Sequence, residues 1–252
     1  MNSIKIISTA LLLSIAPLIF ADEAPTYFEL RTYHANEGKL DELHARFRDH
    51  TVALFKKHGM TNLVYWTPVD NEANTLVYLL GYPDKEARKD SWQAFRDDPE
   101  WQAVYADSTK EGKLVAKVDS VFLNPTDYSP DFPTESAKDP RLFEMRRYTT
   151  NPDKLDALDA RFRDHTVGLF EKHGLTNVAY FHLEDGRDAS ETTLLYFLAI
   201  NDEDTRNAGF KAFSQDPKWK AARDESEKDG KLLIKGGVES TFLTPTDYSP
   251  LQ

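Results

Sequence analysis

The stretch KLDELHARFRDHTVALFKKHG, residues 39–59, returns later in the chain as KLDALDARFRDHTVGLFEKHG, residues 154–174. Seventeen of these 21 positions are identical at an offset of 115 residues. Two further pairs match in the same order: FRDDPEW (95–101) with FSQDPKW (213–219), and VDSVFLNPTDYSP (118–130) with VESTFLTPTDYSP (238–250). A repeat of this length is a whole domain and not a unit of a solenoid. The sequence therefore indicates a tandem duplication.

The repeated stretch itself predicts an amphipathic helix. Its apolar residues Leu43, Phe47 and Leu54 recur at the spacing that places them on one helical face. Asn36 is a candidate for the N-cap of this helix, and Gly59 is a candidate for its C-terminal stop. The candidate core of the unit therefore lies along this helix.

The residues around the helix predict four strands and further helical stretches. Residues 27–33 alternate between apolar and polar side chains, as in a strand with one buried face. The other expected elements are strands at 62–66, 75–82 and 118–123, and helical stretches that begin at Asp84 and Asp98. The resulting order, β-α-β-β-α-β, is that of the split βαβ motif.

We therefore expect an α+β fold made of two ferredoxin-like βαββαβ domains, at residues 25–128 and 141–252, with a linker at 129–140. Each sheet would carry helices on one face only, so its other face needs a cover. The sheet of the second copy is the nearest apolar surface available. We expect the two domains to pack sheet to sheet as an intrachain dimeric α/β-barrel, which is a pseudo-dimer within one chain.

The first 21 residues differ from the rest of the chain. Lys5 precedes an apolar run at 6–20, and the small residue Ala21 comes just before an acidic pair. This layout predicts a signal peptide at 1–21 and a secreted or periplasmic protein, with an uncleaved membrane anchor as the alternative. No later apolar run is long enough to span a membrane, so no membrane association is expected after the signal peptide is removed.

Composition removes several function classes. The 252 residues include no cysteine, which excludes cysteine nucleophiles, disulfides and thiolate metal sites. The net charge of -11 argues against nucleic acid as a partner, because phosphate binding requires a basic surface.

The segments YFELRTY (27–33), KLxxLxxRFRDHTxxLFxKHG and FxxDPxW together resemble the NIPSNAP family, which belongs to the dimeric α/β-barrel superfamily. The resemblance covers both copies and implies the barrel fold. It implies little about activity, because that family has no single agreed function. Members of the wider superfamily include cofactor-free monooxygenases and haem enzymes.

A polar row on the first strand of each copy gives the ligand-binding candidates. If Phe28 packs on the helices, the alternating polar side chains point into the barrel. The candidates are Glu29, Arg31, Tyr33, Glu144, Arg146 and Tyr148, together with Trp66, which the resemblance places at the end of the second strand. Such a row would bind a polar or anionic small molecule. The alternative is a Glu–Arg pair that only fixes the register of the sheets.

His50 and His165 are candidate catalytic residues, because both fall on the apolar stripe of the repeated helix. The alternative is a pair of hydrogen-bonded core histidines. No HExxH motif or other metal-ligand spacing is present, so we expect no metal site and assign no cofactor.

The function indicated is that of an exported NIPSNAP-like protein of unassigned activity that binds a polar small molecule between its repeats. The alternative is a cofactor-independent monooxygenase-like or haem-binding enzyme. Whether the chain is an enzyme, and whether it assembles further, stay open.

Overall fold

The computed structural model describes residues 24–133 and 141–252. The predicted signal peptide (1–21) and the end of the predicted linker (134–140) lie outside the described residues. The first half contains β1 (Tyr27–Ala35), α1 (Leu40–Arg46), η1 (Phe47–Thr51), α2 (Val52–Lys57), β2 (Thr61–Pro68), β3 (Thr75–Tyr82), α3 (Lys85–Asp97), α4 (Pro99–Ser108) and β4 (Val115–Pro125). The second half contains β5 (Leu142–Thr150), α5 (Leu155–Arg161), η2 (Phe162–Thr166), α6 (Val167–Lys172), β6 (Thr176–Leu183), β7 (Thr193–Ile200), α7 (Glu203–Gln215), α8 (Pro217–Ser226) and β8 (Leu233–Pro245).

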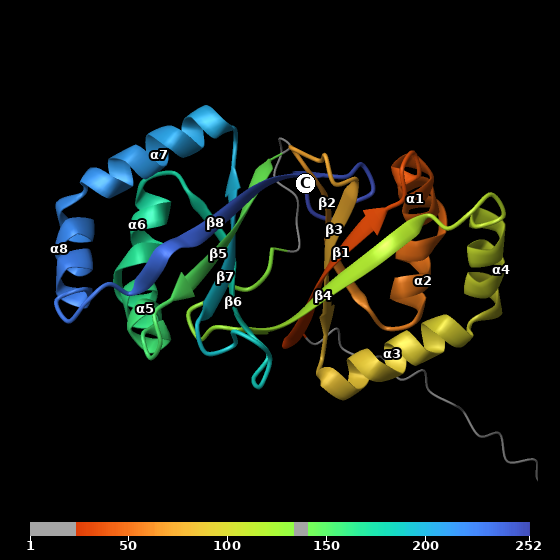
Figure 1. Ribbon diagram of the computed structural model, residues 1–252, viewed down its shortest axis with the longest axis horizontal. Helices are drawn as coiled ribbons and strands as arrows, with labels where there is room; N and C mark the ends of the chain where they lie inside the picture. Colours follow the sequence, from red (N-terminus) through yellow and green to blue (C-terminus); the bar gives the residue numbers. More distant parts are fainter. Residues whose placement is uncertain (1–23, 134–140) are drawn as a thin grey trace, which may run out of the picture.

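The eight strands form one closed barrel in the order β1-β3-β2-β8-β5-β7-β6-β4. All neighbouring strands are antiparallel. The two halves join at β2–β8, where Trp66 pairs with Pro245, and at β4–β6, where Leu123 pairs with Leu183. Figure 1 shows the strands between two outer layers of helices, one from each half. The predicted association of the two sheets is therefore confirmed.

Several helix ends follow local capping chemistry. The carboxylate of Asp84 accepts a hydrogen bond from the Ala87 amide (2.7 Å), as expected for the N-cap of α3. Gly59 follows α2 with a φ of +76°, which favours glycine. The expectation for Asn36 was wrong. The helix begins at Leu40, and the Asn36 side chain instead donates to the Lys113 carbonyl (2.6 Å).

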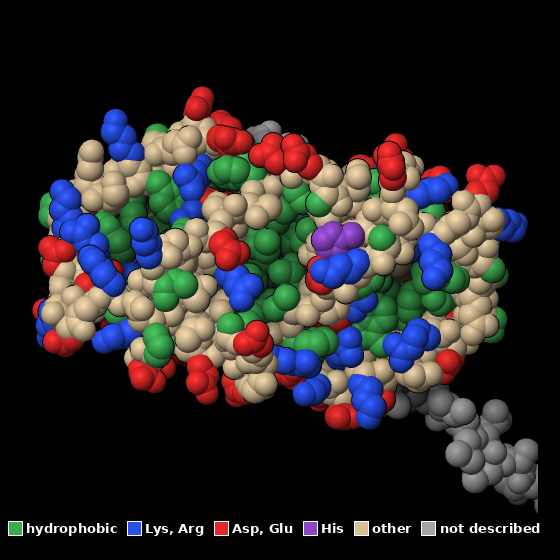
Figure 2. All heavy atoms as spheres, in the orientation of Figure 1, with side chains coloured by type: hydrophobic (Ala, Val, Ile, Leu, Met, Phe, Trp, Pro, Cys, Tyr) green, Lys and Arg blue, Asp and Glu red, His purple; other side chains and the backbone are tan. Residues whose placement is uncertain are grey.

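The barrel interior is apolar. Side chains from both halves fill it, with Trp66 stacked on Phe197 (5.1 Å between ring centroids) and Phe28 against Phe181 (4.9 Å). An eight-stranded barrel is narrow enough for its own side chains to fill the interior. Figure 2 shows apolar side chains where the two halves meet, with charged side chains around them.

Each half also holds the other through its C-terminal TDYSP segment, at residues 126–130 and 246–250. Asp247 accepts two hydrogen bonds from Arg48 in the first half (2.8 and 2.7 Å), and Asp127 accepts two from Arg163 in the second (2.9 and 2.6 Å). The hydroxyl of Ser249 likewise accepts a hydrogen bond from the Tyr65 amide (3.0 Å). The two segments are thus exchanged across the pseudo-dimer.

Candidate functional site

The predicted polar row faces the helices and not the barrel interior. Glu29 contacts Arg88 and Trp92 of α3, while its neighbour Phe28 lies inside the barrel. The expectation of a polar lumen was therefore wrong. The alternation of apolar and polar residues shows that a strand has two different faces. It does not show which face lies inside the barrel, because that depends on the side chains that each face contacts in the folded protein. Charged groups find theirs on the helices, whereas the apolar faces of the two sheets cover each other.

The buried carboxylate of Glu29 is the centre of a hydrogen-bonded network. It accepts from Arg31 (2.6 Å), twice from Arg88 (2.9 Å each) and from the Trp92 indole (2.9 Å). Burial opposes ionisation, yet the hydrogen bonds and charges of Arg88 and Arg31 hold the pKa of Glu29 below its ordinary value. This arrangement stabilises the helix–sheet layer and leaves little room on Glu29 for a ligand.

The second half repeats this network around Glu144. The carboxylate is fully buried and accepts from Arg206 (2.9 and 2.6 Å), Ser240 (2.6 Å) and Arg146. Arg146 also donates to Tyr148 (3.2 Å). Trp66, the remaining ligand-binding candidate, lies apart from both networks in the apolar lumen. The structure therefore divides the predicted ligand-binding residues between two separate networks and the barrel interior, and does not bring them into one site.

The candidate catalytic histidines are exposed. His50 and His165 each fall within a π-helical turn, η1 or η2, inside the repeated helix. The π-helical turn contains one more residue than an α-helical turn, so the residues after it are shifted around the helix axis. As a result Thr51 is buried at the position where regular α-helical spacing would place His50. The Thr51 hydroxyl donates to the Arg46 carbonyl (3.1 Å) within this turn. The expectation that these histidines fall on the apolar stripe of the helix was wrong; His50 lines an open groove between α1 and α4.

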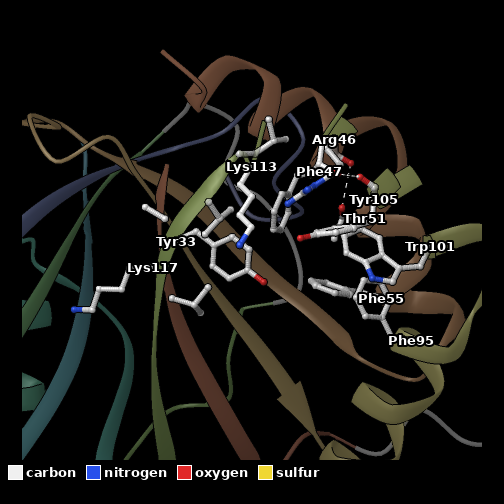
Figure 3. A pocket seen from close by; sticks show the side chains of 15 residues that line it. Tyr33, Arg46, Phe47, Thr51, Phe55, Phe95, Trp101, Tyr105, Lys113 and Lys117 are labelled. Atoms are coloured by element: carbon white, nitrogen blue, oxygen red, sulfur yellow. Dashed lines mark hydrogen bonds between the residues drawn. The ribbon is translucent and has the colours of Figure 1, made fainter. Parts of the chain in front are cut away.

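A cavity of about 310 Å³ lies between the helices and the sheet of the first half. Its aromatic lining comes from three sides, β1, the repeated helix and the α3–α4 corner, and consists of Tyr33, Phe47, Phe55, Phe95, Trp101 and Tyr105. Figure 3 shows these side chains around the cavity, with the exposed start of β4 along one side. Of the predicted residues of the first half, Tyr33 alone lines this cavity.

Arg46 also lines the cavity, although it is not among the residues predicted from the sequence. Its side chain is buried, with the guanidinium 5.4 Å from the ring centroid of Trp101 and 5.8 Å from that of Tyr105. Burial lowers the pKa of Arg46. One signal was available: Arg46 comes three residues after Leu43 and just before Phe47, so it lies next to the apolar stripe.

The second half has a corresponding but smaller cavity of about 170 Å³. Tyr148, Arg161 and Trp219 occupy the places of Tyr33, Arg46 and Trp101. Figure 2 shows apolar side chains with Lys and Arg beside them at both helix-covered ends of the molecule. The duplication has therefore kept the location of the cavity and changed its size.

Residues 24–133 and 141–252 lack two further features. No helix there is long and apolar enough to cross a membrane. No three His, Asp or Glu side chains in those ranges gather closely enough to hold a metal ion.

Several solved structures are similar to this chain. An uncharacterized NIPSNAP domain protein from Burkholderia xenovorans is 26% identical, with 42% of this chain and 99% of that one covered and a TM-score of 0.37. A putative monooxygenase from Lactobacillus acidophilus NCFM is 11% identical, with coverages of 88% and 94% and a TM-score of 0.54. A putative monooxygenase from Fusobacterium nucleatum is 13% identical, with coverages of 88% and 93% and a TM-score of 0.53.

The likeness to the two monooxygenases shows a shared α+β barrel fold and nothing more. No functionally curated protein matches the chain. The family model described as NIPSNAP matches twice, over residues 28–130 and 143–250, which include most of both halves. The chain therefore belongs to the NIPSNAP family.

Proposed function

We propose that this protein binds a small molecule with a flat, apolar body in the cavity between the helices and the sheet of the first half. We also propose that each half is a ferredoxin-like unit. The observation that carries the proposal is the aromatic lining of that cavity from three separate elements. Aromatic side chains offer large apolar surfaces and favour planar partners. Ligand sites in proteins are typically apolar hollows with a few polar groups.

The size of the cavity limits the ligand. Its volume of about 310 Å³ is at the lower end of the range for small-molecule sites, roughly 300–1,000 Å³. An apolar cavity of about 150 Å³ can already hold benzene. A molecule with one or two fused rings therefore suits the first half, and the second cavity of about 170 Å³ would hold less.

Filling one cavity at a time tests the proposal. Val115 lines the first cavity and Leu233 occupies the same place in the second. We expect 2-naphthol or 2-naphthoate to bind at one site per chain in calorimetric titrations. Val115→Phe should abolish this binding, while Leu233→Phe should leave it unchanged. Absence of binding for both probes, or equal loss in both variants, would refute the proposal.

A cofactor-independent monooxygenase is the second candidate, supported by the fold shared with the two putative monooxygenases. Such a reaction needs a base that removes a proton from the substrate. The residues that line the first cavity include neither histidine nor carboxylate, and this favours binding over oxygenation. If the protein consumed oxygen in the presence of 2-naphthol, and Val115→Phe abolished this uptake, oxygenation would be favoured over binding alone.

We also propose that the protein acts outside the cytoplasm. The proposal rests on the leader pattern of residues 1–21. Fusion of residues 1–30 to alkaline phosphatase, which is active only after export, should give an active enzyme in a bacterial host. An inactive fusion that accumulates in the cytoplasm would count against export.

A further inference from the structure

Arg46 is a buried cation with little to offset its charge in the part of the chain that the structure describes. Only 6% of the residue is exposed, and among the described residues its guanidinium makes one hydrogen bond, to the Ser108 hydroxyl (3.3 Å). Its Nε is buried and has no acceptor among those residues. Among the described residues, no carboxylate oxygen lies within 4.0 Å of this guanidinium, although the salt bridges elsewhere in the molecule meet that distance. A buried charge is costly unless another group compensates it.

The same arginine in the second half does have a carboxylate. Arg161 is 3.3 Å from Glu227, which also accepts a hydrogen bond from Lys231 (2.7 Å). Arg161 otherwise repeats the contacts of Arg46, with a long hydrogen bond to Ser226 (3.4 Å) and a ring centroid, that of Trp219, at 5.1 Å. The second cavity thus carries its own anion.

One position accounts for this difference. Counting from Trp101 and Trp219, the residue that corresponds to Glu227 is Thr109, and the residue that corresponds to Lys231 is Lys113. Thr109 and Lys113 both line the first cavity. The Thr109 hydroxyl donates to the carbonyl of Tyr105 (2.7 Å) and carries no charge to offset Arg46. The first cavity therefore keeps two cations that the second neutralises internally.

Several charged side chains around Arg46 and Lys113 are paired with other residues. In the view of Figure 3, Lys113 extends toward the Tyr33 ring at the cavity, whereas Lys117 points away. Lys117 instead pairs with Asp119 (2.9 Å). Arg46 also borders the outer groove between α1 and α4, where the acidic lining residues are Glu42, Asp49 and Asp107. Glu42 is paired with Lys39 (2.7 Å) and Asp107 with Lys110.

We propose that the first cavity takes a planar aromatic carboxylate, with the ring among the aromatic side chains and the carboxylate bound by Arg46 at the place that Glu227 fills in the second half. The inference rests on the proposed function and adds the charge of the ligand. Guanidinium groups bind carboxylates through two parallel hydrogen bonds. Lys113 adds a second, solvent-exposed attraction at the opening.

The experiment compares two probes of one shape, 2-naphthoate and the uncharged 2-naphthol, on the full chain. A charge-assisted hydrogen bond stabilises a complex by about 1.5–3 kcal/mol, so we expect 2-naphthoate to bind about tenfold or more tightly. Thr109→Glu should remove this preference, because the new carboxylate would occupy the anion position. Thr109→Gln has nearly the same size without the charge and should keep most of the preference.

Two matched controls complete the design. Lys113→Gln is an exposed change that should weaken 2-naphthoate moderately and leave 2-naphthol unchanged. Glu227→Gln alters only the second half and should leave both affinities unchanged. Equal affinities of the two probes for the wild type, or equal losses in Thr109→Glu and Thr109→Gln, would overturn the carboxylate inference while the proposed function stands. If neither probe binds, the proposed function itself fails.

Discussion

The two halves of this molecule have one framework and two different cavities. Around Glu29 and Glu144 the halves repeat the same buried carboxylate with two arginines. Around Arg46 and Arg161 they diverge, because the first half has the uncharged Thr109 where the second half has Glu227. Duplication therefore preserved the interactions that hold helices on the sheet. The positions that face the cavity were free to change. The first cavity is larger than the second, and the charge of Arg46 is not offset by a carboxylate among the described residues as that of Arg161 is by Glu227.

Breaking the shared framework should give the largest effect on stability. Glu29→Gln and Glu144→Gln each leave two arginines without their carboxylate, and the loss of one partner from a buried ion pair costs about 3–5 kcal/mol. The two losses should be similar, because each carboxylate also accepts a hydrogen bond from a neutral donor, the Trp92 indole for Glu29 and the Ser240 hydroxyl for Glu144. The measurement is the free energy of unfolding in urea. A change below about 1 kcal/mol in either variant would contradict a structural role.

A second difference between the halves should appear as a pH dependence. Glu184 and Val69 hold the same position after β6 and β2, since their amides donate to the carbonyls of Phe122 and Phe242. Burial opposes ionisation of Glu184, but hydrogen bonds from Lys85, Arg187 and Tyr27 lower its pKa to about 2. Val69 is 48% exposed and has no such partners.

Glu184→Gln sharpens this comparison. Because the folded-state pKa lies below the ordinary value of 4.5, the carboxylate stabilises the fold above pH 4.5 and this stabilisation is lost as the pH falls toward 2. We expect Glu184→Gln to lower the melting temperature at pH 6 and to match the wild type near pH 2. Val69→Thr, the control in the first half, should show no such pH dependence. A difference that is constant across this range would contradict the assignment.

The exchanged TDYSP segments should give the smallest effect. Asp127→Asn and Asp247→Asn each remove one exposed bidentate pair, with Arg163 and Arg48 respectively. Exposed ion pairs contribute little and are screened by salt. We expect two equal, small decreases in melting temperature that disappear in 1 M NaCl. A large loss from one side only would show that the two segments are not equivalent.

Much of the fold could be predicted from sequence because it depends on local patterns. The strand at residues 27–33, the caps at Asp84 and Asp98 and the stop at Gly59 follow from alternation and capping preferences. The repeat then identified the missing cover of each sheet as the other sheet. The candidate site could not be predicted in this way. Arg46 and Thr109 are 63 positions apart, and no sequence pattern says that they line one cavity.

The sequence by itself determined the duplication, the order of elements and the barrel, since each depends on periodicity or on matches along the chain. Only the tertiary structure decided which face of β1 is inside, because Glu29 finds Arg88 59 residues away. The tertiary structure also decided which residues of the repeated helix are buried, because the π-helical turn exposes His50 and buries Thr51. Burial and charge pairing are properties of neighbours in space, and those neighbours are distant in the sequence.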